Sequence, residues 1–158
     1  MKYTCIKTVA IYLLATLPLL ANASTHKVKI THSVMVVDGI AKFIPEGFDA
    51  QKIPSFAIEK EPREQGALPA DWVLVPEFSL TDGKANASLT VPEGTSIYGG
   101  GEVTGSLLRN GKTIKLWNTD SGAYGVDKGT RLYQSHPWMM GVRKDGTAFG
   151  ILFDTTWK

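Results

Sequence analysis

The sequence SIYGGGEVTGSLLRNGKTIKLWNTDSGAYGVD, residues 96–127, contains the pattern around which the rest of the chain is organised. A short strand-like piece, Ser96–Tyr98, leads directly into Gly99, Gly100 and Gly101. Three consecutive glycines allow positive φ angles, or a close approach to another segment, at a cost in chain entropy. We therefore expect the chain to leave a strand here and to open into a glycine-hinged loop.

Aromatic and short polar residues occur together in the second half of this stretch. Trp117 and Tyr124 flank the polar run Asn118–Ser121. Aromatic rings stack on the apolar face of a pyranose, while carboxylates and amides form hydrogen bonds with its hydroxyls. The pattern therefore suits sugar binding. The alternative is that Trp117 and Tyr98 are core residues of a β domain and that the polar residues form turns.

Five short motifs occur in a fixed order along the C-terminal half of the chain. They resemble the N-terminal β-sandwich domain, which is galactose mutarotase-like, of glycoside hydrolase family 31. That family contains α-glucosidases, α-xylosidases and related enzymes. The resemblance is best over residues 96–158 and looser over residues 27–92. The five motifs are Tyr98–Glu102, Thr104–Gly105, Leu116–Asp120, Leu132–Pro137 and Gly150–Asp154.

The resemblance implies how this domain would take part in catalysis. In the family, a (β/α)8 barrel follows the domain and carries both catalytic aspartates, so we expect a barrel C-terminal to Lys158 and no catalytic residue in this chain. The chain alone should be inactive. Asp120 would lie on the loop that reaches the barrel's active site and would form hydrogen bonds with substrate hydroxyls; the alternative is an Asx turn. The other substrate-binding residues expected on this loop are Trp117, Thr119, Ser121 and Tyr124.

Three functions remain open at this point. The first is the N-terminal domain of a secreted α-glycosidase that hydrolyses α-linked glucosides or xylosides. The second is a stand-alone carbohydrate-binding module that uses Trp117, Tyr124 and Asp120. The third is an aldose-mutarotase-like enzyme, for which Glu102 and His136 are the plausible acid–base pair. All three take an oligosaccharide, a glycoside or a simple sugar as the ligand.

The N-terminus has the features of a secretory signal peptide. Lys2 and Lys7 form a basic region, Val9–Leu20 is apolar, and Ala21–Ala23 is an A-x-A cleavage site. This pattern is typical of a cleaved signal and the apolar run is short for a membrane span. We predict cleavage after Ala23, a secreted or periplasmic protein, and a mature domain of residues 24–158.

Charge and composition disfavour several other partners. Removal of the two signal lysines leaves 15 basic residues against 15 acidic ones, with no long run of either sign. Nucleic acids and anionic membranes both require clustered Lys and Arg, so neither is an expected partner. His26, His32 and His136 share no ligand spacing, and the single cysteine, Cys5, lies in the signal. We therefore expect neither a metal site nor a cofactor.

Tight-turn signals divide the chain into short apolar pieces. Asp38-Gly39, Asp82-Gly83, Asn110-Gly111 and Asp145-Gly146 are all turn pairs. Short strands between such turns predict an all-β chain, here an antiparallel β-sandwich in a single domain. The expected strands are Lys27–Thr31, Val34–Val37, Ile40–Ile44, Phe56–Lys60, Trp72–Val75, Phe78–Leu80, Ala87–Val91, Ser96–Tyr98, Ile114–Leu116, Leu132–Gln134, Trp138–Arg143 and Thr147–Phe153.

Overall fold

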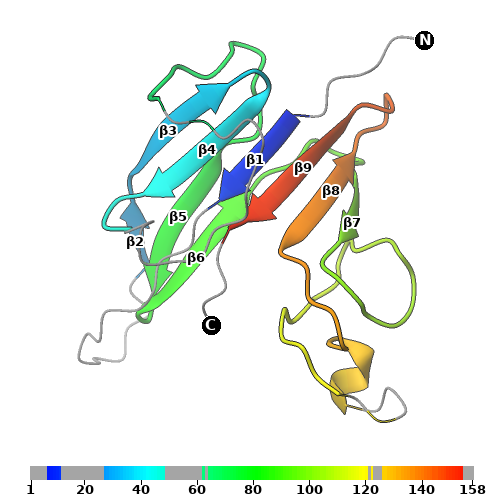
Figure 1. Cartoon of the computed structure of the whole chain (residues 1–158). Coiled ribbons are helices and arrows are strands. Elements are labelled where there is room, and N and C mark those ends of the chain that lie inside the picture. The colour runs from blue at the N-terminus through cyan, green and yellow to red at the C-terminus, as the bar shows by residue number, and fades with distance from the viewer. Residues whose placement is uncertain are drawn as a thin grey trace. The chain divides into compact units, whose positions relative to one another are not determined.

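A computed structural model of the chain describes residues 7–11, 27–48, 62, 64–120, 122 and 126–154 (Figure 1). The chain divides into two compact units, and each is described by itself. The first, which we call the sandwich unit, comprises Lys7–Val91 with Phe153–Lys158. The second, which we call the loop unit, comprises Pro92–Leu152 with Met1–Ile6.

One sheet of the sandwich unit is built around a tight hairpin. Strand β3 (His32–Val37) runs antiparallel to β4 (Ile40–Pro45). The turn residues between them, Asp38 and Gly39, have φ angles of 28° and 81°. Positive φ at both central residues is the geometry of a type I′ turn, whose twist matches that of the strands. Strand β1 (Lys7–Ile11) adds to the other edge of β4 in parallel, so this sheet is not wholly antiparallel.

The second sheet of the sandwich unit also contains a hairpin with an Asp-Gly turn. Its strand order is β2-β5-β6, with β2 (Lys27–Ile30), β5 (Pro76–Thr81) and β6 (Lys84–Leu89) all antiparallel to their neighbours. Asp82 and Gly83 turn the chain between β5 and β6 with φ angles of 50° and 73°. Both hairpins therefore form where the Asp-Gly pairs predict them.

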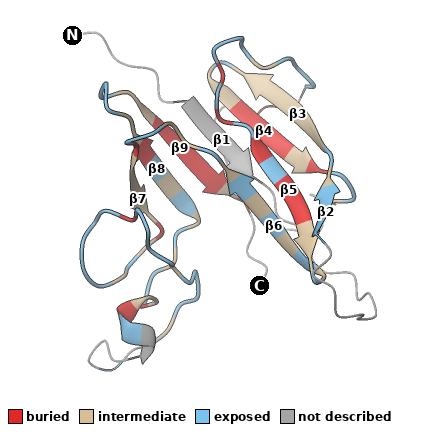
Figure 2. Cartoon of the chain, turned by 180° about the vertical axis from the view of Figure 1, so that it is seen from behind, coloured by how far each residue is buried: buried red, intermediate tan, exposed pale blue. Residues whose placement is uncertain are grey.

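The core of the sandwich unit lies between these two sheets. The His32 ring of β3 meets Phe43 of β4 and Phe78 of β5 edge-on, with centroids 5.4 and 5.5 Å apart. Phe43 is fully buried, and Figure 2 shows that β4 and β5 carry much of the buried surface. Burial lowers the pKa of His32, and the nearby positive charge of Lys29 lowers it further.

The sheet of the loop unit has the order β7-β8-β9. Strand β7 (Ser96–Gly99) pairs with β8 (Trp138–Val142), and β8 pairs with β9 (Ala148–Phe153), each antiparallel. In the turn between β8 and β9, Gly146 has a φ of 81° and its N–H donates to Arg143 O at 3.0 Å. These features are those of a type I turn followed by a bulge glycine. They confirm the predicted hairpin at Asp145-Gly146.

Two strands predicted in the connection between β7 and β8 are wrong. Residues 114–116 and 132–134 form no strand, although their neighbourhoods are joined by hydrogen bonds from Lys115 N to Thr130 O and from Thr119 N to Leu132 O. Between these two bonds, one segment advances four residues, from Lys115 to Thr119, while the other advances only two, from Thr130 to Leu132. A three-residue turn, in which Trp117 N donates to Lys115 O at 3.0 Å, takes up the difference. A regular ladder cannot form with unequal steps.

A third predicted strand, at residues 72–75, is also not formed. Trp72 and Leu74 are buried while Val73 and Val75 are exposed, so the alternation that suggested a strand is present. The indole N–H of Trp72 donates to Leu74 O at 2.7 Å within the segment. Alternating burial therefore occurs here in a segment that is not part of a sheet.

The all-β prediction is confirmed by this arrangement. Helix is confined to short 3-10 pieces among the described residues, of which η3 (Val126–Gly129) is one. Within the described residues, no helix has the length and apolar character needed to cross a membrane. The predicted strand at 56–60 lies outside the described residues, as do Ala23 and most of the predicted signal peptide. Strand β1 lies within the predicted signal peptide. Cleavage of this peptide after Ala23 stays a prediction.

Candidate functional site

The three glycines at the end of β7 form a corner whose backbone geometry favours glycine over every other residue. Gly99, Gly100 and Gly101 have φ angles of 107°, 80° and 90°. A Cβ atom on Gly99 would lie 2.4 Å from Trp138 O, and one on Gly101 would lie 2.4 Å from Gln134 O. Side chains at these positions would therefore be strained and would also clash with backbone.

Beyond the corner the chain stays against the segment that enters β8. Gly100 N donates to Trp138 O at 2.9 Å, and Glu102 N donates to Gln134 O at 2.8 Å. Two residues later, Thr104 N donates to Gly129 O at 3.0 Å. The beginning of the connection is thus tied to its end by backbone hydrogen bonds. In Figure 1 this connection runs from β7 to β8 and includes η3.

A buried arginine holds the base of the loop. Arg109 is only 8% exposed, and its side chain donates from Nε to Gly99 O at 3.0 Å and from Nη1 to Ser106 O at 2.6 Å. Its backbone N–H donates to Ile97 O at 2.7 Å. Arg109 gives no signal in the sequence, because no local pattern distinguishes a buried arginine from an exposed one.

Asn110 completes the same anchor with its side chain. Its Oδ1 accepts a hydrogen bond from Ile97 N at 2.9 Å, and its Nδ2 donates to Thr95 O at 2.8 Å. Lys112 N donates to Arg109 O at 3.0 Å, which confirms the predicted turn at Asn110-Gly111. Together with Arg109, Asn110 occupies backbone groups of β7 that face away from β8, and so protects an edge strand.

The candidate sugar-binding residues that the structure describes lie in the next part of the connection. Trp117 is 45% exposed and Asp120 is also exposed. Thr119 lies between them and is anchored by its N–H, which donates to Leu132 O at 2.7 Å. The Thr119 hydroxyl donates to Trp117 O at 3.1 Å. These contacts hold the backbone of the segment against residues 130–133, while Trp117 and Asp120 are both exposed in part to solvent.

Asp120 has a side-chain partner that no pattern in the sequence predicts. The Tyr133 hydroxyl donates to Asp120 Oδ1 at 3.1 Å. The predicted roles of Trp117, Thr119 and Asp120 in substrate binding remain predictions. Ser121 and Tyr124, predicted to bind substrate with them, lie outside the described residues.

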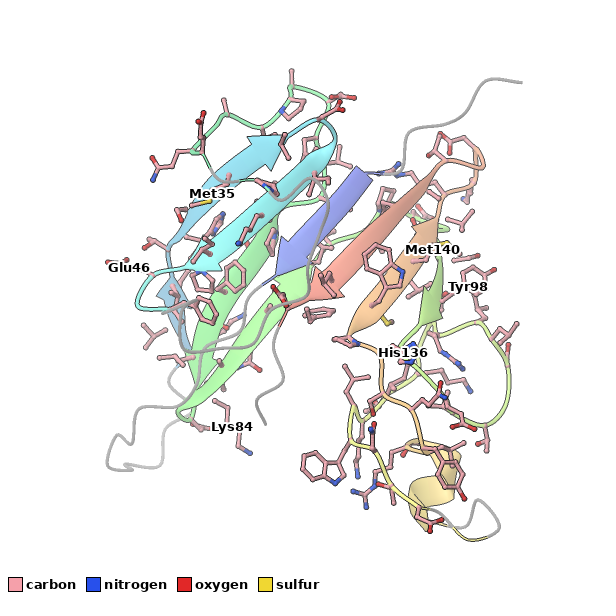
Figure 3. All side chains as sticks on the ribbon, viewed as in Figure 1. Met35, Glu46, Lys84, Tyr98, His136 and Met140 are labelled. Carbon is pink, nitrogen blue, oxygen red and sulfur yellow. The ribbon has the colours of Figure 1, made fainter. Side chains whose placement is uncertain are left out.

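Glu102 and His136, the pair considered for ring-opening chemistry, come from neighbouring backbone segments. A Cβ atom on Gly101 would lie 2.8 Å from His136 N, and Glu102 N is bonded to Gln134 O. Both side chains are exposed. Figure 3 labels His136 at the start of β8 and also shows Tyr98 and Met140 on neighbouring strands. The fold thus places the two residues near each other in space, although 34 positions separate them in the sequence.

The exposed groups of this site are of kinds that can contact a sugar. An exposed indole offers a stacking face, and a carboxylate and a hydroxyl offer hydrogen-bonding groups for sugar hydroxyls. Among the described residues there is no group of three or more His, Cys, Asp and Glu side chains that could hold a metal ion.

Comparison with known proteins identifies the family of the C-terminal part of the chain. Residues 56–158 match the family model described as the glycosyl hydrolase 31 N-terminal galactose mutarotase-like domain. The chain is 48% identical over 66 residues to alpha-glucosidase 2 of Bacillus thermoamyloliquefaciens, a match that covers 42% of this chain and 8% of that protein. It is 42% identical over 80 residues to an alpha-glucosidase of Hordeum vulgare, covering 49% of this chain and 9% of that protein. The matched region thus spans less than a tenth of either relative.

Proposed function

Because the chain belongs to the glycosyl hydrolase 31 N-terminal galactose mutarotase-like domain family, we propose that it is the front domain of an α-glycosidase. In this proposal it contributes a substrate-binding loop to an enzyme that hydrolyses α-linked glucosides or xylosides. The names of the two relatives, both alpha-glucosidases, support this reaction class.

The observation that carries the proposal is the anchored loop at residues 117–120. Its backbone is bonded through Thr119 to Leu132, while the Trp117 ring and the Asp120 carboxylate are exposed. A sugar ring that stacks on Trp117 and bonds to Asp120 through its hydroxyls would use both.

We also propose the partner and the location that complete this function. A (β/α)8 barrel would supply the two catalytic aspartates, because retaining and inverting glycosidases need a pair of carboxyl groups flanking the scissile bond. The barrel would receive the loop at residues 117–120. The signal-like N-terminus would direct the protein to the secreted or periplasmic compartment.

A sugar titration of the whole chain tests the proposed binding role. We expect maltose or an α-xyloside to shift the NMR signals of residues 117–120 in the millimolar range, because one exposed ring and a few hydrogen bonds give weak affinity. Trp117→Ala and Asp120→Ala should each weaken binding by roughly 3- to 30-fold.

The matched control for Asp120 is Asp82→Asn. Asp82 is also an exposed turn residue, and its positive φ is well tolerated by Asn. Asp82→Asn should leave sugar binding unchanged. Absence of any sugar-dependent shift at residues 117–120 would overturn the binding role, as would equal losses for Asp82→Asn and Asp120→Ala.

The proximity of Glu102 and His136 gives an aldose mutarotase-like function some support as a second candidate. This reaction opens and recloses the sugar ring and needs a general acid and a general base within reach of the sugar. Polarimetry on freshly dissolved α-glucose tests it. An accelerated change in rotation that is lost in Glu102→Gln and His136→Gln would favour this candidate, and a rate equal to that of buffer would remove it.

A stand-alone carbohydrate-binding module would share the loop but not the barrel. Sequencing the transcript beyond the codon for Lys158 separates it from the front domain of an α-glycosidase. An in-frame barrel with two aspartates supports the glycosidase, whereas a stop codon combined with sugar binding supports the module.

A further inference from the structure

We infer that Tyr133 is a positioning residue for Asp120: its hydroxyl selects the orientation in which the Asp120 carboxylate meets a sugar. This inference rests on the proposed function, since it assigns a role to a neighbour of the substrate-binding loop. The Tyr133 hydroxyl is 3.1 Å from Asp120 Oδ1.

Two consecutive contacts join the two segments. Thr119 N donates to Leu132 O, and the next residue on each side supplies the contact between Asp120 and Tyr133. The backbone hydrogen bond sets the distance between the two segments, and the side-chain hydrogen bond then sets the direction of the Asp120 carboxylate. Because the segments do not continue as a ladder, this local pair is well placed to decide where Asp120 points.

The exposure of the pair indicates that its role is orientation rather than stability. Tyr133 is 50% exposed and Asp120 is exposed as well. A hydrogen bond between groups in contact with water contributes little to folding, because water replaces it when it breaks. A tyrosine ring has few rotatable bonds, however, so it holds its hydroxyl in place at a small cost in entropy.

The chemistry of the carboxylate leaves room for the substrate. An ionised Asp accepts hydrogen bonds at about four lone-pair sites on its two oxygens. The bond from Tyr133 uses one site on Oδ1. The other sites can accept hydrogen bonds from sugar hydroxyls in the direction that Tyr133 selects, which reduces the ordering cost of binding.

The test compares Tyr133→Phe with Tyr98→Phe in the whole chain. The first variant removes only the hydroxyl that contacts Asp120, and the second removes the hydroxyl of a half-buried tyrosine on β7. Three-bond couplings to the Asp120 Cβ protons report its χ1 populations. We expect averaging among rotamers in Tyr133→Phe and no change in Tyr98→Phe. Unchanged amide exchange at Thr119 would show that the loop remains folded.

Sugar affinity provides the second readout, through a double-mutant cycle with maltose. Tyr133→Phe should weaken binding by roughly three- to tenfold, and Tyr98→Phe should stay within about twofold of the wild type. In an Asp120→Ala background, Tyr133→Phe should have almost no further effect, because a positioning role acts on the sugar through the Asp120 carboxylate. Equal effects in both backgrounds would overturn the inference.

The two readouts separate this inference from the proposed function. If the wild-type chain binds no sugar, the proposed function fails. The χ1 couplings of Asp120 then alone test whether Tyr133 positions its carboxylate. Rotamer averaging in Tyr133→Phe then still supports positioning, whereas unchanged couplings overturn it.

Discussion

The sandwich unit and the connection between β7 and β8 reach their structures by different means. In the sandwich unit, aromatic side chains such as Phe43 and Phe78 are buried between two sheets, and Asp-Gly turns join the strands. In the connection, the residues that the structure describes between 100 and 137 have almost no regular structure and are shaped by glycines and by hydrogen bonds such as those of Arg109. The first region depends on burial, which is non-directional, and the second on contacts that are strongly directional.

The largest expected effect is in the sandwich unit. Phe43→Ala removes a fully buried ring and should destabilise the unit by about 3–5 kcal/mol, through lost burial and the cavity left behind. Urea denaturation followed at β4 amides measures this. The control is Val28→Thr on β2, where Val28 is 53% exposed, and its effect should stay within about 0.5 kcal/mol. Similar costs for the two changes would show that burial does not dominate here.

The next effect is at the glycine corner. Gly101→Ala adds backbone strain of about 1–3 kcal/mol at a φ of 90°. It also adds a clash, since the new Cβ would lie 2.4 Å from Gln134 O. Gly105→Ala is the matched control, because Gly105 has a φ of 89° but nothing within 4 Å of its Cβ position. Denaturation of both variants should give the larger loss for Gly101→Ala, and equal losses would mean that close approach is unimportant at the corner.

A smaller effect is expected at the buried arginine. Arg109→Met keeps the aliphatic length but removes the donors to Gly99 O and Ser106 O, at a cost of about 1–2 kcal/mol. Hydrogen exchange at residues 97–110 should accelerate. Lys112→Met removes a nearby exposed cation and should leave exchange unchanged. If both variants behave alike, the charge of Arg109 matters more than its hydrogen bonds.

The smallest effect is a pH dependence of the sandwich unit. The pKa of His32 is lowered from 6.5, so the unfolded chain binds a proton more readily than the folded one. The contribution of neutral His32 is therefore complete above the unfolded pKa and decreases as pH falls through the folded value. Phe at this position keeps the ring contacts without titrating, so His32→Phe should flatten the stability profile below pH 6.5.

Lys29→Met sharpens this test. The charge of Lys29 is the second cause of the lowered pKa, after burial. Its removal should reduce the slope less than His32→Phe does. If the slope of stability against pH were unchanged in His32→Phe, the pH dependence would belong to another titrating group.

The candidate site was only partly predictable. The pattern of Trp117 and Asp120 beside short polar residues indicated an exposed sugar-binding segment, and the structure exposes both side chains. Arg109 and Tyr133 gave no such signal. Their roles depend on Gly99 and Asp120, which are 10 and 13 positions away and come close only after the connection folds. The strands expected at residues 114–116 and 132–134 were wrong for the same reason, because pairing requires a register that local propensity does not encode.

Local chemistry by itself determined the all-β class, the hairpins at Asp38-Gly39, Asp82-Gly83 and Asp145-Gly146, and the need for glycine at residues 99–101. Each of these depends on the φ angles that two or three adjacent residues can adopt, so neighbours in the sequence carry the information. Only the tertiary structure decided that Arg109 is buried beneath the loop and that Tyr133 meets Asp120. Hydrogen bonds between distant segments depend on the final positions of both partners, and these positions arise only when the chain has folded.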